Sequence, residues 1–589
     1  MNTTEAPRRR TVTSGDVSLA VYEQGEPEHP TVLLVHGYPD NHQVWDDVAA
    51  DLAADHHVVR YDVRGAGGSD HPAHRDDYAL EALARDLFAV AEATSPGRPV
   101  HVVAHDWGSI QSWEAVTDRA APGRIASYTS LSGPCLDHVA HWTRHRYRHP
   151  TPRHLVQLLN QAAHSWYIAA FHVPALAPAV WRYGLAARWG TVLRTLEGVR
   201  PRPGHPRPDL AGDAVRGIEL YRANMLPRLR NPRRRPTLLP VQLITLTKDH
   251  YVSPALAEGA APWVPNLWRR SIPATHWSAL LGKGTTVARM VREFVGHHEG
   301  TPAAPQLDRA RRRREADAER PFTGQLAVVT GAGSGIGRAT ALAFAEQGAD
   351  VVVCDIDAEA AERTAALARL LGAEASAYRV DVSDGAAVDA FAAEVAAGHG
   401  VPDIVVNNAG VGHAGSFLET TEKEWRRVLD VNLWGVIHGC RAFGALLTER
   451  NEGGHIVNVA SAAAYLPSRA LAAYATSKAA VVMLSDCLRA EVAGAGIGVS
   501  AICPGVIKTD ITRTTTFSGL GAEEQDERRR RATDAYSRRN YPPEKVAAQI
   551  LRAVRSNRAV VPVTPEARVG RLVSRVSPGL LRKAARFPR

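Results

Sequence analysis

The first half of the chain carries a carboxylate, a second carboxylate and a histidine in an order suited to covalent hydrolysis. Asp106 lies in the segment VVAHDWGS, where an apolar run passes through small residues into a helical pattern. This strand-turn-helix context can hold a nucleophile on a strained bend. Asp249 follows another apolar run, and His276 comes later in the chain. If the fold brings the two together, the acid can orient the imidazole, which then activates water as a general base.

An aspartate nucleophile restricts the chemistry that Asp106 could perform. Attack on an ester carbonyl would give a reactive anhydride, whereas attack on an sp3 carbon bearing a leaving oxygen or halide gives a stable alkyl ester. Hydrolysis of this ester needs a base, and His276 oriented by Asp249 is predicted to supply it. Backbone N–H groups near Tyr38 and Trp107 are predicted to hold the oxyanion.

A glycine-rich turn in the second half predicts a nucleotide site. The sequence TGAGSGIG at 330–337 follows an apolar run and opens a helical pattern. Glycines permit a tight turn and let the backbone approach a pyrophosphate at the N-terminus of the helix. The residues of this turn predicted to bind the cofactor are Gly331, Ser334, Gly335, Ile336 and Gly337.

The choice of cofactor depends on the end of the next apolar run. Asp355 ends that run, roughly twenty residues beyond the turn, where a carboxylate accepts hydrogen bonds from the adenosine ribose hydroxyls. The same carboxylate repels a 2′-phosphate, and Ser334 offers no basic partner for one. We therefore predict NAD as the cofactor, with NADP as the less favoured alternative.

The second half also contains groups that could move a proton during a redox reaction. Tyr474 and Lys478, in YATSK, are spaced so that phenol and ammonium share one helix face. The positive charge is expected to lower the pKa of the tyrosine toward the working range. Tyr474 is predicted to be the general acid or base, Ser461 to hold the substrate oxygen, and Asn432 to support a water-linked proton path.

Further motifs of the first half resemble those of the epoxide hydrolases, which have the α/β-hydrolase fold. The segment HGYP at 36–39 stands where that family forms its oxyanion hole, and the loop DVRGAGGSD at 62–70 is typical of it. Two cap segments, SWYIAAF and ELYRANM, resemble those that carry paired epoxide-activating tyrosines. The resemblance assigns that role to Tyr167 and Tyr221 and implies hydrolysis of an epoxide to a vicinal diol.

Two alternatives for the first half remain open. Haloalkane dehalogenases are the close rival, although they commonly carry asparagine where Tyr38 stands. A non-catalytic lipid-binding module is the other, and the intact nucleophile, acid and histidine argue against it. Ala104 and Thr275 replace glycines that are usual in the family, and both are small.

The spacing TGxxxGxG, together with YxxxK, resembles the short-chain dehydrogenases/reductases. This resemblance implies further contacts to the cofactor from Asp381 and Val382 near the adenine, from Asn408, Ala409 and Gly410 in the cleft, and from Pro504, Gly505 and Thr509 on the nicotinamide side. The order of a hydrolase followed by a dehydrogenase resembles the two-domain mycobacterial epoxide hydrolase D type. It implies a bifunctional enzyme, in which the diol from the first site could be oxidised at the second.

Both halves alternate apolar runs with helical segments, which predicts parallel sheets whose ligands gather at the carboxyl ends of the strands. The predicted fold class is α/β, with an α/β-hydrolase fold and a helical cap followed by a Rossmann-type doubly wound parallel sheet. The predicted parts are a hydrolase domain at 1–297 with its cap at about 136–236, a linker at 298–321, a dehydrogenase domain at 322–565 and a basic amphipathic tail at 566–589.

Composition excludes several other classes of protein. No apolar stretch approaches the roughly 18 residues of a membrane-spanning helix, and the first residues lack the apolar core of a signal peptide. The five cysteines are scattered and form no CxxC pair, so neither a disulfide framework nor a metal site is predicted. We expect a cytoplasmic enzyme, with possible association with a membrane.

The net charge of +9 comes largely from arginine clusters, which we interpret as solvated loops rather than a nucleic-acid site. The tail either docks on its own domain or contacts an anionic membrane surface. The apolar cap sequence predicts an apolar small-molecule substrate, and a homo-oligomer is what the dehydrogenase family leads us to expect.

Overall fold

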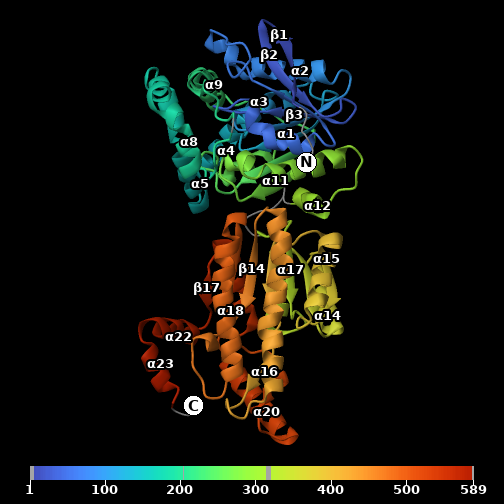
Figure 1. Ribbon diagram of the computed structural model, residues 1–589, viewed down its shortest axis with the longest axis vertical. Coiled ribbons are helices and arrows are strands. Elements are labelled where there is room, and N and C mark those ends of the chain that lie inside the picture. The colour runs from blue at the N-terminus through green and yellow to red at the C-terminus, as the bar shows by residue number, and fades with distance from the viewer. Residues whose placement is uncertain (1–5, 203, 313–319, 587–589) are drawn as a thin grey trace. The chain divides into compact units, whose positions relative to one another are not determined.

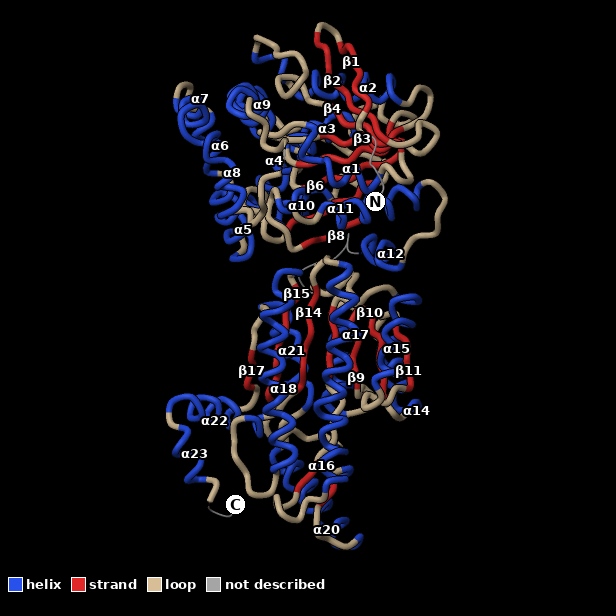
Figure 2. Tube along the Cα trace, viewed as in Figure 1, coloured by secondary structure: helices blue, strands red, loops and turns tan. Residues whose placement is uncertain are grey.

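The computed structural model of the chain describes residues 6–202, 204–312 and 320–586. Contacts between residues divide the chain into two units, Met1–Glu315 and Ala316–Arg589, each with a sheet of its own (Figures 1 and 2). Both units have parallel strands flanked by helices, which confirms the predicted α/β class.

The sheet of the first unit has the strand order β1-β2-β4-β3-β5-β6-β7-β8. Its strands are β1 (Arg8–Ser14), β2 (Val17–Gln24), β3 (Thr31–Val35), β4 (His57–Tyr61), β5 (Val100–His105), β6 (Ile125–Leu131), β7 (Val241–Leu246) and β8 (Leu267–Ile272). Strand β2 pairs antiparallel with β1 and β4, and the remaining pairs are parallel. Strands β3 and β5 are buried at every residue, which explains why most of their residues are apolar.

Helices cover both faces of this sheet. They are α1 (Asp46–Leu52), α2 (Leu80–Thr94), α3 (Trp107–Val116), α10 (Ser278–Leu281) and α11 (Gly284–His298). Helices α1 and α11 bury Val48 and Val291 in one apolar cluster. Helices α2 and α3 bury Leu87 and Trp113 in a second cluster. The carboxyl ends of β5, β7 and β8 are thereby fixed at one edge, where the cap lies.

The cap consists of helices inserted between β6 and β7. They are α4 (Leu136–Arg148), α5 (Pro152–His164), α6 (Trp166–Phe171), α7 (Leu176–Val180), α8 (Ala186–Thr195) and α9 (Leu210–Arg230). The side chain of Asn224 on α9 accepts a hydrogen bond from the Leu80 N–H and donates to the Tyr78 carbonyl. These contacts join the cap to the start of α2.

The structure differs from the expected linker in one respect. Part of the segment 298–321 forms helix α12 (Pro305–Arg312), which packs on the first unit. Leu307 and Ala310 of this helix are buried against Trp268 and Phe294. The charged residues around them masked this short apolar face in the sequence.

The sheet of the second unit is parallel, with the order β11-β10-β9-β12-β14-β15-β17. Its strands are β9 (Leu326–Thr330), β10 (Asp350–Asp355), β11 (Ala375–Arg379), β12 (Ile404–Asn407), β14 (Gly454–Val459), β15 (Ile497–Cys503) and β17 (Val560–Pro562). Two short strands, β13 (His413–Ala414) and β16 (Thr516–Phe517), pair beside it. The order reverses between β9 and β12, and such a switch point is where doubly wound sheets bind nucleotides.

The helices of the second unit divide between the two faces. They are α13 (Gly335–Glu346), α14 (Ala358–Leu370), α15 (Gly385–His399), α16 (Glu422–Leu429), α17 (Gly435–Arg450), α18 (Ala472–Glu491), α19 (Ile511–Thr514), α20 (Ala522–Arg539) and α21 (Pro543–Ser556). Helices α13, α14 and α21 bury Phe344, Ala361 and Ile550 on one face. Helices α15 and α17 bury Phe391 and Phe443 on the other, together with part of α18.

The basic tail forms helices α22 (Pro565–Val576) and α23 (Pro578–Ala584). Ala567 and Gly570 of α22 are buried against the second unit, whereas Val569, Leu572, Val576 and Leu580 are exposed. Within the described residues, no helix combines the length and apolar character needed to cross a bilayer.

Candidate active sites

Asp106 occupies a strained bend between β5 and α3. Its φ of 51° and ψ of −126° lie outside the regions that ordinary residues favour. Small neighbours make the bend possible, because a Cβ on Gly108 would stand 2.3 Å from the Val35 carbonyl oxygen. The side chain of Asp106 is therefore presented at the carboxyl end of the central strands, as a nucleophile requires.

Backbone donors hold one oxygen of the Asp106 carboxylate. The Tyr38 N–H donates to Oδ2 at 2.7 Å, and the Trp107 N–H also bonds the carboxylate. A Cβ on Gly37 would lie 2.5 Å from this oxygen, which accounts for the glycine before Tyr38. Oδ2 thus occupies the predicted oxyanion site, and Oδ1 is the oxygen that faces His276.

His276 lies between the two carboxylates. Its Nε2 is 3.6 Å from Asp106 Oδ1, and its Nδ1 is 3.1 Å from Asp249 Oδ2. Asp249 Oδ1 in turn accepts hydrogen bonds from the N–H groups of Tyr251 and Val252. The structure therefore brings together the three residues that the sequence separated by 170 positions, counted from Asp106 to His276.

Burial and mutual charge set the ionisation of these three groups. Burial raises the pKa of Asp106 to about 6, although His276 and the backbone donors oppose this. Burial opposes protonation of His276, but Asp249 and then Asp106 outweigh it and raise the pKa to about 9. Burial also opposes ionisation of Asp249, yet His276 and Ser132 lower its pKa to about 2. At neutral pH the site holds two carboxylates and one imidazolium.

The cap places two tyrosines near Asp106. Tyr167 comes from α6 and Tyr221 from α9, with ring centroids 6.0 Å apart. Tyr221 also packs on Trp107, 4.7 Å between centroids, and its hydroxyl is hydrogen-bonded to that indole. Burial, and then neighbouring charge that includes Asp106, raises the pKa of both phenols above the ordinary value. Both phenols are protonated at neutral pH and can donate to a developing alkoxide.

Ser132 is a residue of this site that sequence reasoning missed. Ser132 follows β6 and has a φ of 50°. Its hydroxyl donates to Asp249 Oδ2, and its Oγ is also 3.1 Å from His276 Nδ1. No spacing in the sequence links it to the other site residues. The only available signal was its position at the carboxyl end of a strand next to β7.

The glycine-rich turn of the second unit forms a cradle at the switch point. Gly331 has a φ of 61°, and a Cβ there would lie 2.6 Å from Ala409 Cα. The Gly333 N–H donates to Asp355 Oδ2 at 2.8 Å, which ties the turn to the end of β10. Asn408 donates from its side chain to the carbonyls of Thr330 and Gly331. Backbone and acidic side chain are thus positioned as a dinucleotide requires.

A cavity of about 1470 Å³ opens beside this cradle, large enough for a dinucleotide and a substrate. The predicted cofactor residues that line it are Gly331, Ser334, Gly335, Ile336, Asp355, Asp381, Val382, Asn408, Ala409, Gly410, Pro504, Gly505 and Thr509. Gly337 does not line the cavity. A Cβ at Gly337 would stand 2.1 Å from the Gly331 carbonyl oxygen, so this glycine permits close packing instead.

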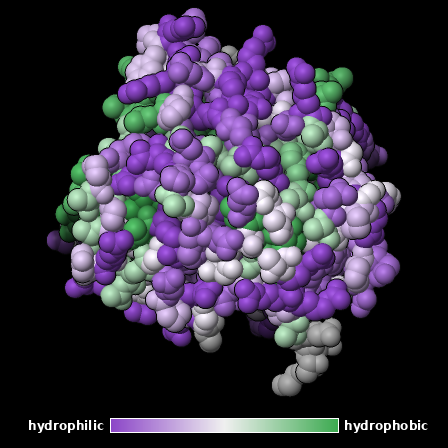
Figure 3. Space-filling view, turned by 90° about the horizontal axis from the view of Figure 1, so that it is seen from above, coloured by the Kyte–Doolittle hydropathy of each residue, from purple (hydrophilic) through white to green (hydrophobic). Residues whose placement is uncertain are grey.

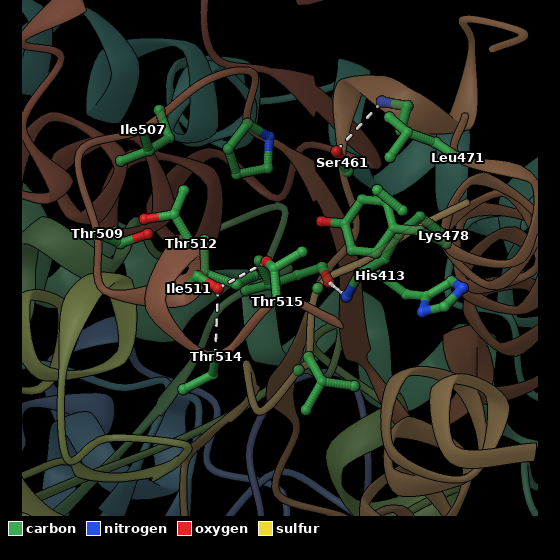
Figure 4. A pocket seen from close by; sticks show the side chains of 18 of the residues that line it. His413, Ser461, Leu471, Lys478, Ile507, Thr509, Ile511, Thr512, Thr514 and Thr515 are labelled. Atoms are coloured by element: carbon green, nitrogen blue, oxygen red, sulfur yellow. Dashed lines mark hydrogen bonds between the residues drawn. The ribbon is translucent and has the colours of Figure 1, made fainter. Parts of the chain in front are cut away.

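The catalytic residues predicted for this unit gather at the same cavity. Ser461, Tyr474 and Lys478 line it, and Figure 4 shows Ser461 and Lys478 on one side with threonines of the segment after β15 on the other. Lys478 Nζ donates to the Val459 carbonyl at 2.9 Å and lies 5.9 Å from the Tyr474 ring centroid. The Tyr474 hydroxyl is hydrogen-bonded to Ser461.

The expected lowering of the pKa of Tyr474 by Lys478 is wrong for this structure. Burial raises the pKa of Tyr474 to about 12, although the bond to Ser461 opposes the shift. Burial also lowers the pKa of Lys478 to about 8. Loss of hydration is the largest cause of both shifts, and the spacing of the two residues in the sequence could not reveal that burial.

Asn432 lies behind the cavity rather than in its wall. It belongs to the π-helical segment Asp430–Trp434, is fully buried, and exchanges two hydrogen bonds with the backbone of Val411. Its side chain oxygen would be 3.2 Å from a Cβ on Gly410, which places it next to the cofactor cleft. In this structure Asn432 positions the strand-end loop.

The tail contributes to the cavity, and this was not foreseen. Glu566, Leu581, Ala584 and Ala585 line it. Glu566 accepts a hydrogen bond from the Val506 N–H, which fixes the tail to the predicted nicotinamide-side loop. The amphipathic pattern of the tail is visible in the sequence, but the surface against which the tail packs depends on the tertiary fold.

These two sites define a chain with an α/β-hydrolase unit followed by a short-chain dehydrogenase unit. A comparison with known families agrees: residues 30–283 match the alpha/beta hydrolase fold, and residues 325–517 match the short chain dehydrogenases. The chain is 46% identical over 588 residues to the probable oxidoreductase EphD of Mycobacterium tuberculosis, with 98% of each chain covered. The chain therefore belongs to the family of this two-domain mycobacterial oxidoreductase.

The dehydrogenase unit is also similar to other proteins. It is 43% identical over 191 residues to D-threitol dehydrogenase of Mycolicibacterium smegmatis, which covers 32% of this chain and 72% of that protein. Among solved structures, a short chain dehydrogenase/reductase of Burkholderia phymatum in complex with NAD is 33% identical, with a TM-score of 0.41, and covers 45% of this chain and 96% of that one.

Proposed function

We propose that the first unit hydrolyses an epoxide to a vicinal diol and that the second is an NAD-dependent dehydrogenase acting on an alcohol or carbonyl. The observation that supports the hydrolase most strongly is the combination of a carboxylate on the nucleophile bend with two protonated tyrosines over it. A carboxylate nucleophile requires an sp3 carbon, and the phenols suit an oxygen leaving group.

The first step forms an ester with the enzyme. Asp106 Oδ1 attacks one epoxide carbon, and the carbon–oxygen bond of the ring breaks. The electron pair of that bond stays on the oxygen, which takes a proton from Tyr167 or Tyr221. Oδ2 remains on its backbone donor, the Tyr38 N–H at 2.7 Å.

The second step releases the diol. The proton of the His276 imidazolium first restores the tyrosine hydroxyl that gave its proton to the leaving oxygen. Neutral His276 then accepts a proton from water through Nε2, and the hydroxide adds to the ester carbonyl carbon of Asp106. Negative charge then develops on Oδ2, where the Tyr38 and Trp107 N–H groups already point. The bond between the Asp106 carboxyl carbon and Oδ1 then breaks, and the diol leaves with Oδ1 and a proton from His276. The hydroxyl that came from water returns its proton to His276, so Asp106 regains a carboxylate that contains one oxygen from water.

The geometry favours an epoxide over a haloalkane. A halide ion is held by N–H donors, and the Trp107 indole next to the nucleophile already bonds the Tyr221 hydroxyl. Tyrosine hydroxyls instead serve an alkoxide, which must gain a proton. Halide release from a panel of haloalkanes at a rate equal to epoxide turnover would favour the dehalogenase alternative.

A single turnover in heavy-oxygen water tests the carboxylate mechanism directly. The proposal predicts an unlabelled diol in the first turnover and label in Asp106, found by mass spectrometry of the protein. In His276→Gln, which lacks the base, the ester should accumulate as a covalent adduct. Label in the first diol would mean direct attack by water. Failure to trap any adduct in His276→Gln would favour a unit that only binds lipid.

In the second unit, the chain's own residues handle the proton and the substrate oxygen. The Tyr474 hydroxyl gives or takes the proton at that oxygen, and Ser461 donates a hydrogen bond to it. Lys478 donates to the Val459 carbonyl and holds positive charge beside Tyr474. When bound, NAD supplies or accepts the hydride. Tyr474→Phe should abolish turnover while leaving cofactor binding intact, as followed by fluorescence of NADH.

The carboxylate of Asp355 supports NAD rather than NADP. It is held at the end of β10 by the N–H groups of Gly333 and Asp357, where a ribose 2′-phosphate would meet its negative charge. We expect Asp355→Ala to reduce kcat/KM with NAD. The ratio of kcat/KM with NAD to kcat/KM with NADP should fall by about tenfold or more. Glu359→Ala, an exposed acid on α14, is the control. An unchanged ratio in Asp355→Ala would contradict the assignment.

A connection between the two reactions is also part of the proposal. The diol product is an alcohol, and an NAD-dependent dehydrogenase could oxidise it to a hydroxyketone. Two similar proteins are named for substrates with hydroxyls on neighbouring carbons, namely D-threitol dehydrogenase and 2,3-dihydro-2,3-dihydroxybenzoate dehydrogenase of Bacillus subtilis, the latter 37% identical over 201 residues. Those names support, for this chain, a substrate with two adjacent hydroxyls.

The exposed side of the tail supports a proposed contact with an anionic membrane. Arg568 and Arg575 alternate with exposed Leu572 and Val576, a pattern that suits lipid headgroups. Leu572→Asp with Val576→Asp should weaken binding to vesicles that contain phosphatidylglycerol.

We also propose that the chain associates with itself, and analytical ultracentrifugation of the full chain measures this self-association.

A further inference from the structure

Helix α5 of the cap is turned with its apolar side toward solvent. Leu155, Val156, Leu159 and, on the adjoining α6, Trp166 are 50%, 66%, 72% and 72% exposed. Spacing places Leu155, Val156 and Leu159 on one side of α5, and Trp166 is the first residue of α6. We name these four residues the outer stripe. Large exposed apolar residues gathered in one place mark an interaction surface rather than an ordinary solvated face.

The opposite side of α5 is polar and bonded to the hydrolase unit. Gln157 donates to Glu258, and Gln161 accepts from the Ser253 N–H and donates to the Tyr251 carbonyl. Arg153 forms an ion pair with Glu258 at 3.0 Å. The orientation of α5 is therefore held by specific hydrogen bonds, and no residue of α5 is buried. The exposure of the outer stripe follows from how this helix is docked.

The charge of the surrounding segment indicates what could cover the outer stripe. Residues 138–196 contain no aspartate or glutamate but include the arginines Arg144, Arg146, Arg148, Arg153, Arg182, Arg188 and Arg194. Among these, Arg182, Arg188 and Arg194 are exposed on the helical segments that follow α6. Helices α5 to α8 lie together at one side of the first unit (Figure 2), and hydrophobic residues gather at that side in the space-filling view (Figure 3).

We infer that the outer stripe and the arginines around it dock the cap on an anionic lipid surface. Apolar side chains enter the boundary between headgroups and acyl chains, and guanidinium groups bind the phosphates. A second copy of the chain fits less well, because a two-fold contact through this face would bring like charges together.

The outer stripe lies close to the hydrolase site, so docking on lipid would affect how a substrate enters that site. Trp166 points to solvent, whereas the next residue, Tyr167, packs with Ile168 and Phe171 against the core near Asp106. A lipid surface on the outer side of α6 is therefore one helix away from the hydrolase site. This step rests on the proposed function, and it implies that an epoxide on an apolar chain enters from the lipid phase.

Vesicle flotation of the full chain tests the docking without any measurement of activity. Vesicles of phosphatidylcholine with phosphatidylglycerol should bind the native chain, and pure phosphatidylcholine vesicles should bind it at least about tenfold more weakly. Leu155→Asp with Leu159→Asp should weaken binding to the anionic vesicles by at least about tenfold. Leu370→Asp is the matched control, because Leu370 is 84% exposed on α14 of the other unit.

Several outcomes would overturn the docking proposal. One is equal binding of the double variant and the native chain, and another is absence of binding to anionic vesicles. A native dimer that the double variant converts to a monomer would identify a second copy as the partner. If the aspartates lower the unfolding temperature, Leu155→Gln with Leu159→Gln repeats the test without new charge. All of these results are independent of whether the hydrolase acts on epoxides.

Discussion

At the scale of single residues, the ionisation states of Asp106 and His276 suit a reaction in two steps. Asp106 has a pKa of about 6 and His276 one of about 9, so the carboxylate and the imidazolium coexist at neutral pH. Part of the raised pKa of His276 comes from the negative charge of Asp106. Formation of the ester removes that charge, so the pKa of His276 should fall at the stage when a neutral base is needed.

The rate of ester formation should therefore depend on pH in a defined direction. Because the pKa of Asp106 is raised to about 6, its carboxylate is present above this pH and is lost as the pH falls through it. We expect the single-turnover rate of epoxide consumption to decline below about pH 6. Stopped-flow measurements across the range check this. A rate that stays constant down to pH 4.5, well below the range expected for a buried carboxyl, would contradict the assigned ionisation.

Removal of either cap phenol should slow ring opening. Tyr167→Phe and Tyr221→Phe are each expected to lower kcat by roughly one to two orders of magnitude, and the double variant by more, because the alkoxide loses its proton donors. Tyr183→Phe is a matched control, since Tyr183 is a cap tyrosine that is 86% exposed. Full activity in the double variant would show that another group protonates the leaving oxygen.

At the scale of elements, a buried ion pair fixes the loop after β4 to helix α2 of the first unit. Arg64, in the loop after β4, makes two hydrogen bonds of 2.6 Å to the Asp86 carboxylate on α2. Asp86→Ala would leave the guanidinium buried without its partner, which costs about 3–5 kcal/mol. Urea unfolding of the first unit within the full chain measures the loss. Asp76→Ala, at an exposed acid nearby, should change stability by less than about 0.5 kcal/mol.

The elements show which features the sequence could predict. The bends at Asp106 and Gly331 were predictable because small residues, an apolar run and a helical pattern adjoin there, and local sterics require that combination. Ser132 was not, because its role depends on two strands being neighbours in the sheet. The raised pKa of Tyr474 was not predictable either, because burial depends on packing from distant segments.

Helix α5 illustrates the same limit from another side. The apolar spacing of Leu155 and Leu159 is visible in the sequence and is usually taken as the buried side of a helix. The structure reverses this expectation, because Gln157 and Gln161 find partners on the hydrolase unit. Periodicity defines a side of a helix, and only tertiary contacts decide which side faces the core.

At the scale of the whole chain, two sheets with separate cores carry two separate sets of catalytic groups. Each set lies at the carboxyl ends of the strands of its own sheet. In the proposed function, the product of the first unit belongs to the class of reactants that the second unit would oxidise. Variants that disable one unit should therefore leave the other active on its own substrate.

Mass spectrometry of the products from an epoxide, with and without NAD, tests the central claim most directly. The native chain should give the diol without NAD and the hydroxyketone with NAD. Tyr474→Phe should stop at the diol, and Asp106→Ala should give neither product while still oxidising added diol. Diol formation that is unaffected by Asp106→Ala would contradict the account, as would NADH formation from the epoxide in that variant.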